Sequence, residues 1–276
     1  MNISKKIVAV AFVLLAATPA FAGKGGSAGK IAAAVNSGSV DAIVAEVERA
    51  EGLVCPDCIG TMMNLLEDNR FAVREVAAWW FAKRPGAKEQ LATTFKVELV
   101  NGASVDVRNA ADFLGRVRQF DALPQLRTAI ARTDLSTEAK LSIVRAVGFM
   151  AHIDGNSVLL TAMNDADASV RAAAVGAWRE ILGQLDVKPL VAKLGDADAK
   201  VRAAAANVIG VYGEPSARVA LEQLVTTDAD PFVRRNSAWA LGRIGSADSA
   251  AALRTAANDS SGIVRGFASA ALATLR

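Results

Sequence analysis

Residues 230–245 read DPFVRRNSAWALGRIG, and related stretches occur at residues 167–174 (DASVRAAA) and 198–205 (DAKVRAAA). Each stretch has an aspartate, then an apolar residue followed by arginine, then small residues. The apolar and basic pair recurs at steps of 31 to 34 residues, and its basic members are Arg74, Arg108, Lys140, Arg171, Arg202, Arg234 and Arg265. Such a period is typical of helical hairpins that bury their apolar faces only by stacking on one another. The sequence therefore predicts an all-α fold, an α-solenoid of about seven helical hairpins.

The residues around each arginine predict where the second helix of a hairpin begins and ends. Asp167, Asp198 and Asp230 stand four residues before the arginine, and aspartate is a preferred N-cap residue. Pro231 follows at the first helical position, where its missing N–H costs nothing. Serine takes the capping position in other copies, at Ser104, Ser136 and Ser261. Glycines are expected to end several of these helices, at Gly148, Gly210 and Gly242.

These stretches resemble the bacterial HEAT-like repeats of the type named after phycobilisome lyases. The resemblance is specific between about residues 158 and 276, and looser between residues 57 and 157. It implies that the repeated valine is a core residue, that the repeated arginine pairs with acids of its own or an adjoining repeat, and that the solenoid is a protein-binding scaffold. The residues of this structural repeat are Arg74, Arg108, Arg171, Arg202, Arg234, Arg265, Asp167, Asp198 and Asp230.

Two enzymatic relatives follow from the same resemblance. Deoxyhypusine hydroxylase binds a di-iron centre through repeated His-Glu pairs, whereas this chain has only His152, followed by Ile153. That activity is therefore excluded. A bilin-lyase-like activity remains as a remote alternative, although an exported protein is separated from chromophore attachment in the cytoplasm.

The first residues have the pattern of a signal peptide. Lys5 and Lys6 precede an apolar run over residues 7–17, and Ala20-Phe21-Ala22 has small residues where a signal peptidase reads. The run is shorter than the roughly 20 residues of a membrane-spanning helix. We therefore expect a signal peptide at residues 1–22, a flexible mature N-terminus at 23–38 and the repeat array at 39–276. The protein is expected in the periplasm or outside a bacterial cell, with no membrane insertion after cleavage.

Charge argues against a nucleic-acid partner. The whole chain has a formal net charge of +3, and two of its lysines lie in the leader. The remaining basic and acidic residues nearly balance and alternate along the repeats, whereas nucleic-acid binders usually show a clustered basic stripe. The sequence indicates no cofactor and leaves the oligomeric state open.

One column of residues is a candidate binding surface. Residues five positions after the repeated basic residue lie nearly opposite the apolar arc of each second helix. Large aromatic and arginine side chains often anchor interfaces, and the members of this column that we expect in a protein or peptide groove on the concave face are Trp79, Phe113, Arg145, Asn207 and Trp239. The alternative is that these rings pack against adjoining repeats. Trp80 and Trp178 lie nearer the apolar arc and are expected to be buried.

Cys55 and Cys58 are the second candidate site. In an exported protein a single cysteine pair is most simply a structural disulfide. A helix N-terminus would also lower the pKa of Cys55 and favour thiol exchange. A zinc site would need further ligands from carboxylates, because the sequence has no other cysteine.

Catalytic side chains are otherwise scarce, since a serine or cysteine nucleophile needs a base and His152 is the single histidine. The favoured interpretation is an exported, non-enzymatic scaffold that binds a protein or peptide. The alternative is a thiol-redox or assembly factor that uses Cys55 and Cys58, since thiol-disulfide exchange is the only chemistry the residues support.

Overall fold

The structure is a computed structural model that describes residues 27–53 and 55–275. Every regular element in these ranges is a helix, arranged as stacked helical hairpins, so the prediction of an all-α solenoid is confirmed. The chain divides into two compact units, unit 1 up to Met150 and unit 2 from Ala151. The sequence pattern, which predicts one array over residues 39–276, does not reveal this division. The signal peptide predicted at residues 1–22 lies outside the described residues.

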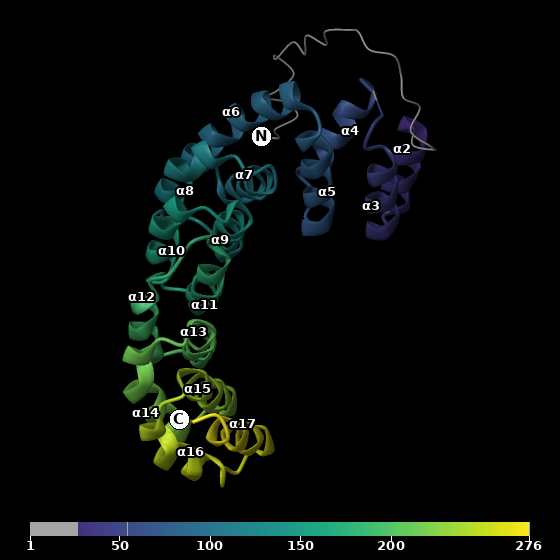
Figure 1. The fold of residues 1–276 in the computed structure, drawn as a ribbon. Helices are drawn as coiled ribbons and strands as arrows, with labels where there is room; N and C mark the ends of the chain where they lie inside the picture. Colours follow the sequence, from purple (N-terminus) through teal and green to yellow (C-terminus); the bar gives the residue numbers. More distant parts are fainter. Residues whose placement is uncertain (1–26, 54, 276) are drawn as a thin grey trace. The chain divides into compact units, whose positions relative to one another are not determined.

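Unit 1 is a set of helices in which α3, α5, α7 and α9 pack side by side and α6 and α8 form a second layer (Figure 1). The helices of unit 1 are α2 (Ala28–Ser37), α3 (Val40–Arg49), α4 (Cys58–Leu65), α5 (Phe71–Ala82), α6 (Pro85–Asn101), α7 (Ser104–Arg116), η1 (Phe120–Ala122), α8 (Leu123–Ile130) and α9 (Thr137–Met150).

Residues 28–37 form helix α2, where the sequence predicts a flexible N-terminus through residue 38. The hydroxyl of Ser27 caps this helix by accepting from the backbone N–H of Lys30 at 3.2 Å. Ile31 and Ala34 are buried on its inner face. The expectation was wrong over these residues because an apolar stripe three residues apart is enough to hold the segment against α3 and α4.

Unit 2 repeats one arrangement, with α11, α13, α15 and α17 in one layer and α10, α12, α14 and α16 in the other (Figure 1). Its helices are η2 (Ile153–Gly155), α10 (Asn156–Ala162), α11 (Ala168–Ala177), η3 (Trp178–Glu180), α12 (Lys188–Val191), η4 (Ala192–Gly195), α13 (Ala199–Tyr212), η5 (Pro215–Ala217), α14 (Arg218–Thr227), α15 (Pro231–Ile244), η6 (Ala247–Ser249), α16 (Ala250–Ala256) and α17 (Gly262–Leu272).

The apolar residue of the repeated pair is the centre of each hairpin's core. The seven side chains at this position have no exposed surface: Val73, Val107, Ala139, Val170, Val201, Val233 and Val264. Full burial of such side chains is the main source of stability for stacked hairpins. Trp80 and Trp178 are also buried, as the sequence predicts.

Aspartate begins three of the second helices of unit 2. The carboxylates of Asp167, Asp198 and Asp230 each accept from the backbone N–H two residues later, at 2.7 to 2.8 Å. Ser104 differs from the expected cap, because it lies inside α7 and its hydroxyl accepts from the backbone N–H of Ser136 instead.

Glycine ends two of these helices, but at positions other than the expected ones. Gly213 and Gly245 have φ values of 68° and 75° and terminate α13 and α15, in the left-handed conformation that glycine adopts without strain. Gly210 and Gly242 lie inside the helices, where they permit close packing. A Cβ on Gly242 would lie 2.9 Å from the Cβ of Ala271 in α17.

Helices long and apolar enough to span a membrane are absent from the described ranges.

Candidate functional site

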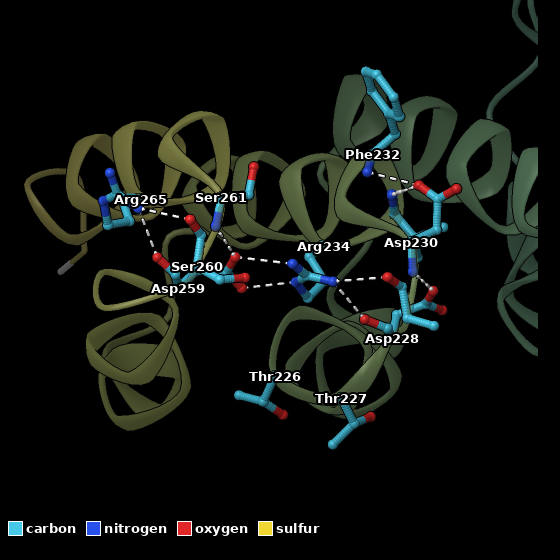
Figure 2. A network of polar contacts seen from close by, with 12 residues as sticks. Thr226, Thr227, Asp228, Asp230, Phe232, Arg234, Asp259, Ser260, Ser261 and Arg265 are labelled. Carbon is cyan, nitrogen blue, oxygen red and sulfur yellow. Dashed lines mark hydrogen bonds and ion pairs between the residues drawn. The ribbon is translucent and has the colours of Figure 1, made fainter.

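The repeated arginine of unit 2 joins two successive turns. Nε and Nη2 of Arg234 donate to the two carboxylate oxygens of Asp259 at 2.7 and 2.9 Å, and its Nη1 donates to the carbonyl oxygens of Asp228 and Ala229 at 2.8 and 3.1 Å. Figure 2 shows Arg234 between these two turns. A bidentate pair of this kind fixes geometry as well as adding energy.

Arg171 and Arg202 repeat the same contacts. Arg171 binds Asp196 through Nε and Nη2 at 2.9 and 2.8 Å, and Arg202 binds Asp228 at 2.7 and 2.9 Å. Nη1 of each guanidinium also donates to two carbonyl oxygens of the turn before its own helix. We call this set of contacts the arginine clamp. It is structural, since its polar groups are satisfied within the chain.

The clamp favours the ionised form of its aspartates. Hydrogen bonds from Arg171 and Arg234 lower the pKa of Asp196 and Asp259, against a smaller opposing effect of desolvation. For Asp228, desolvation favours the neutral acid, but the hydrogen bonds from Arg202 and from the backbone N–H of Asp230 outweigh it and the pKa is lowered.

Unit 1 has a variant of this clamp. Arg74 donates to Asp112 at 2.7 Å and to the carbonyl oxygens of Asp68 and Asn69. Asp112 is buried and also accepts from Arg145 at 2.9 Å. Arg108 pairs with Glu138 at 3.2 Å.

Arg265 has half of the clamp. Its Nη1 donates to the carbonyl oxygens of Asp259 and Ser260 at 2.8 and 3.0 Å (Figure 2). In contrast to Arg234, it forms no ion pair with a carboxylate of the described residues.

A groove lies between α15 and α17 in unit 2. It has a volume of about 690 Å³, and its lining includes Trp239, Gly242, Arg243, Phe267, Ala270 and Thr274. The large side chains among its lining residues are those of Trp239, Arg243, Ile244 and Phe267. We call this the α15–α17 groove.

Trp239 is held in this groove by its neighbour α13. A Cβ on Gly210 would lie 2.4 Å from Cζ3 of the Trp239 ring, so the ring rests directly on the glycine backbone. Trp239 remains half buried, with part of its surface in the groove. A large ring that is fixed on one side and open on the other is suited to anchoring a partner, because little side-chain entropy is lost on binding.

Trp79 lines a smaller hollow in unit 1, of about 190 Å³. Other residues that line it are Glu48, Glu75 and Arg116. Arg116 and Glu75 already form an ion pair at 3.4 Å. Trp79 and Trp239 therefore line separate hollows in separate units.

Phe113 does not belong to an exposed surface, and its prediction as a groove residue was wrong. Its side chain is 1% exposed, and its ring centroid lies 4.8 Å from that of Phe95 and 6.4 Å from that of Phe81. The reason is that α7 is packed against α5, α6 and α9. A helix covered on three sides has no outer face at this position.

Arg145 and Asn207 also differ from the groove prediction. Arg145 is paired with Asp112, and its guanidinium carbon lies 4.0 Å from the centroid of the Phe71 ring. These contacts join α5, α7 and α9, so the arginine is not free to anchor a partner. Asn207 is half buried on α13 and lines neither of the two hollows.

Cys55 and Cys58 form a disulfide bond at the start of helix α4. Cys58 is the first residue of the helix and is 1% exposed, whereas Cys55 is only half buried. Groups of three or more His, Cys, Asp or Glu side chains that could hold a metal ion are absent from residues 27–53 and 55–275.

Arg84 holds the turn that leads to this disulfide. Its Nη2 donates to the carbonyl oxygens of Glu51 and Leu53 at 3.1 and 2.8 Å, and its guanidinium stacks on Trp80 with 3.3 Å from Cζ to the ring centroid. Burial lowers the pKa of Arg84 to about 10, with a smaller opposing effect of Glu51. The side chain is therefore still charged at neutral pH.

Phe267 and Arg243 line the groove but are not among the residues predicted from the sequence. A signal was present, because Phe232, Arg235, Trp239 and Arg243 are spaced three or four residues apart, which places them on one face of a helix. The groove prediction compares one equivalent position in each repeat, and such a comparison misses a set of residues that lies along a single helix.

One family model and one solved structure support the repeat architecture. A family model described as HEAT repeats matches residues 187–273. The X-ray structure of YibA from Escherichia coli is 14% identical and has a TM-score of 0.57, covering 89% of this chain and 92% of that chain. A crystal structure of an engineered protein is 20% identical with a TM-score of 0.48, covering 90% and 81%. Human deoxyhypusine hydroxylase in complex with glycerol is 18% identical with a TM-score of 0.39, covering 90% and 96%.

No curated protein matches the sequence. At 14% identity the likeness to YibA shows the fold alone.

Proposed function

We propose that the protein is an exported, non-enzymatic scaffold that binds a protein or peptide in the α15–α17 groove. The observation that carries this proposal is the position of Trp239, which is fixed against Gly210 on one side and open to a groove of about 690 Å³ on the other. The HEAT repeat match over residues 187–273 includes α15 and most of the groove, and HEAT repeats are generally protein-binding modules.

The side chains around the groove are of the kinds that dominate protein interfaces. Phe232 is 56% exposed and Phe267 is 37% exposed. Phe267 lines the groove with Trp239 and Arg243, and Phe232 lies near Arg235 on the same helix α15. Aromatic and guanidinium groups together are the composition of interface hot spots. Exposed aromatic rings gathered at a groove favour a binding site over a purely structural surface.

Site-specific crosslinking in whole cells tests this proposal. A photo-crosslinking amino acid at position 239 of the full chain is expected to give a defined protein adduct, identified by mass spectrometry. The same group at position 254, an exposed arginine of α16, is the control and should not give that adduct. Trp239→Ala should abolish binding of the identified partner to the purified protein. Adducts that are the same at both positions would refute the groove.

Export is part of the proposal and has its own test. It rests on the charged, apolar and small-residue pattern of residues 1–22. The protein recovered from a periplasmic or culture fraction should have the intact mass of a chain that begins at Gly23. Full-length protein found in the cytoplasm would contradict export.

Thiol exchange is a second candidate function, favoured by one observation. Cys55 is accessible while Cys58 is buried, and this asymmetry lets an incoming thiolate attack the outer sulfur. The reduction potential from glutathione equilibration separates the two roles. A value near that of the compartment would favour exchange, and a value well below it would favour a structural disulfide.

A further inference from the structure

One of the two helix layers of unit 2 has no acidic side chains. Neither aspartate nor glutamate occurs within α11, α13, α15 or α17. Three aspartates of the connecting turns, Asp196, Asp228 and Asp259, are already occupied by the arginine clamp. The surface of these helices around the groove is therefore short of negative charge.

Arg243 in the α15–α17 groove and Arg235 beside it have no carboxylate partner in the described part of the chain. Arg243 lines the groove and forms no ion pair there. Arg235 donates from Nε and Nη2 to the side-chain oxygen of Asn236, at 2.9 and 2.7 Å, and this amide does not neutralise its charge.

Aromatic rings orient the guanidinium of Arg235 next to the groove. Its Cζ lies 5.4 Å from the ring centroid of Phe232 and 5.7 Å from that of Phe267. Phe267 lines the groove, so the positive charge lies beside an exposed apolar surface. A guanidinium held between rings is already ordered, and it loses less freedom when it binds a carboxylate.

The hollow of unit 1 lacks this imbalance. Glu48 and Glu75 line it, and Arg116 is paired with Glu75. Arginine without a carboxylate partner is therefore a property of the α15–α17 groove, and the hollow lined by Trp79 does not share it.

We infer that the α15–α17 groove selects an acidic peptide segment, with carboxylates that bind Arg235 and Arg243 and an apolar side chain that packs on Trp239 and Phe267. This inference rests on the proposed function and states the chemistry of the partner. Charge complementarity of this kind sets specificity and the rate of association. A nucleic acid fits less well, because strong binding of phosphates needs many cations and Arg171, Arg202 and Arg234 are used by the clamp.

Fluorescence anisotropy with designed peptides tests the inference on the full chain. Three labelled peptides share the same leucine positions of an amphipathic helix and differ only in having glutamate, glutamine or lysine at the polar positions. The glutamate peptide is expected to bind about tenfold more tightly than the glutamine peptide at low salt, and more weakly as salt is added. The lysine peptide should bind most weakly.

Matched variants identify the charges responsible. Arg243→Gln and Arg235→Gln should each weaken binding of the glutamate peptide several-fold and leave the glutamine peptide unchanged. Arg254→Gln, on the outer helix α16, removes the same charge away from the groove and should have no effect. Far-ultraviolet circular dichroism of each variant verifies that the fold is retained.

The other outcomes are distinct from one another. Equal affinity for the glutamate and glutamine peptides, lost in Trp239→Ala, would overturn the charge selectivity and leave the groove as a binding site. Binding of none of the peptides would overturn both the inference and the groove. Displacement of the glutamate peptide by a poly-thymidine oligonucleotide, dependent on Arg235 and Arg243, would overturn the inference in favour of nucleic acid.

Discussion

Arg202 shows what the repeated arginine does at the scale of a residue. Its side chain joins the turn before its own helix to Asp228 in the following turn, and the exposed fractions of the two side chains are 17% and 4%. Removing one partner of such a pair leaves a charge with little access to water. The penalty is therefore larger than for an ion pair at the surface.

Asp228→Asn is expected to reduce the free energy of unfolding by about 2 to 3 kcal/mol, because Arg202 loses its counter-ion in a site with little solvent. Urea unfolding followed by circular dichroism measures the change. Arg179→Gln removes half of an exposed pair, with side chains 51% and 54% exposed, and should change the free energy by no more than about 0.5 kcal/mol. Equal effects of the two variants would contradict a structural role for the clamp.

Acid should weaken unit 2 through the same aspartates. The pKa values of Asp196, Asp228 and Asp259 are lowered in the folded state, so the unfolded chain binds more protons than the folded chain at acid pH. Their contribution to stability is complete above the unfolded value of about 3.9 and is lost as the pH falls through the lowered values. Urea midpoints measured from pH 6 downward should fall below about pH 4.

The triple variant Asp196→Asn, Asp228→Asn, Asp259→Asn is the control for this pH dependence. It should be less stable at neutral pH, and its urea midpoint should fall less on acidification. A wild-type protein whose stability rose as the pH fell from 5 to 3 would have the opposite sign to that required by the lowered pKa values.

At the scale of the helices, glycine sets how closely α15 and α17 approach. Gly242→Ala is expected to lower the free energy of unfolding by about 1 to 3 kcal/mol, because the new Cβ would lie 2.9 Å from the Cβ of Ala271. Gly266→Ala in α17 has nothing within 4 Å of its new Cβ and should stabilise by about 0.5 to 1 kcal/mol through helix propensity. Thermal unfolding of both variants measures whether each substitution lowers or raises the stability. Destabilisation by both would refute this explanation.

The helices could be predicted from sequence largely because short-range rules decide them. The buried apolar residue of the repeated pair and the capping aspartates depend on residues within one or two turns, and they lie where the pattern predicts. Phe113 could not be predicted in this way, since its burial depends on α5, α6 and α9 packing around α7. The sequence pattern predicts helix ends at Gly210 and Gly242 because a glycine that permits close packing has the same sequence signal as a C-cap.

The groove could be predicted only in part, because it is formed by helices that are distant in sequence. Trp239 follows from its place on one helix, whereas Phe267 joins it from α17, which is distant in sequence. Arginine often anchors interfaces, but the side chain of Arg145 is paired with Asp112 and packs on the ring of Phe71. These contacts depend on which helices pack together, and the sequence of a single helix does not determine its neighbours.

At the scale of the whole molecule, the two compact units should respond separately to loss of the disulfide. Reduction of Cys55–Cys58 is expected to destabilise unit 1 by no more than about 2 kcal/mol, because the closed loop is short. Hydrogen exchange should increase in α4 and leave the amides of α13 and α15 unchanged. The double variant Cys55→Ala, Cys58→Ala should reproduce this without reductant, and faster exchange throughout unit 2 would contradict independent units.

The arginine clamp has a consequence for how arrays of this kind change in length. Arg171 pairs with Asp196, and Arg202 pairs with Asp228, so each arginine binds the capping turn of the next repeat along the chain. Excision of residues 198–229 would join Ala197 to Asp230, so that Asp196 would still meet Arg171 and would precede a capping aspartate as before. In-frame loss or duplication of one hairpin of this chain would thus regenerate the same ion pair at the junction without a further substitution.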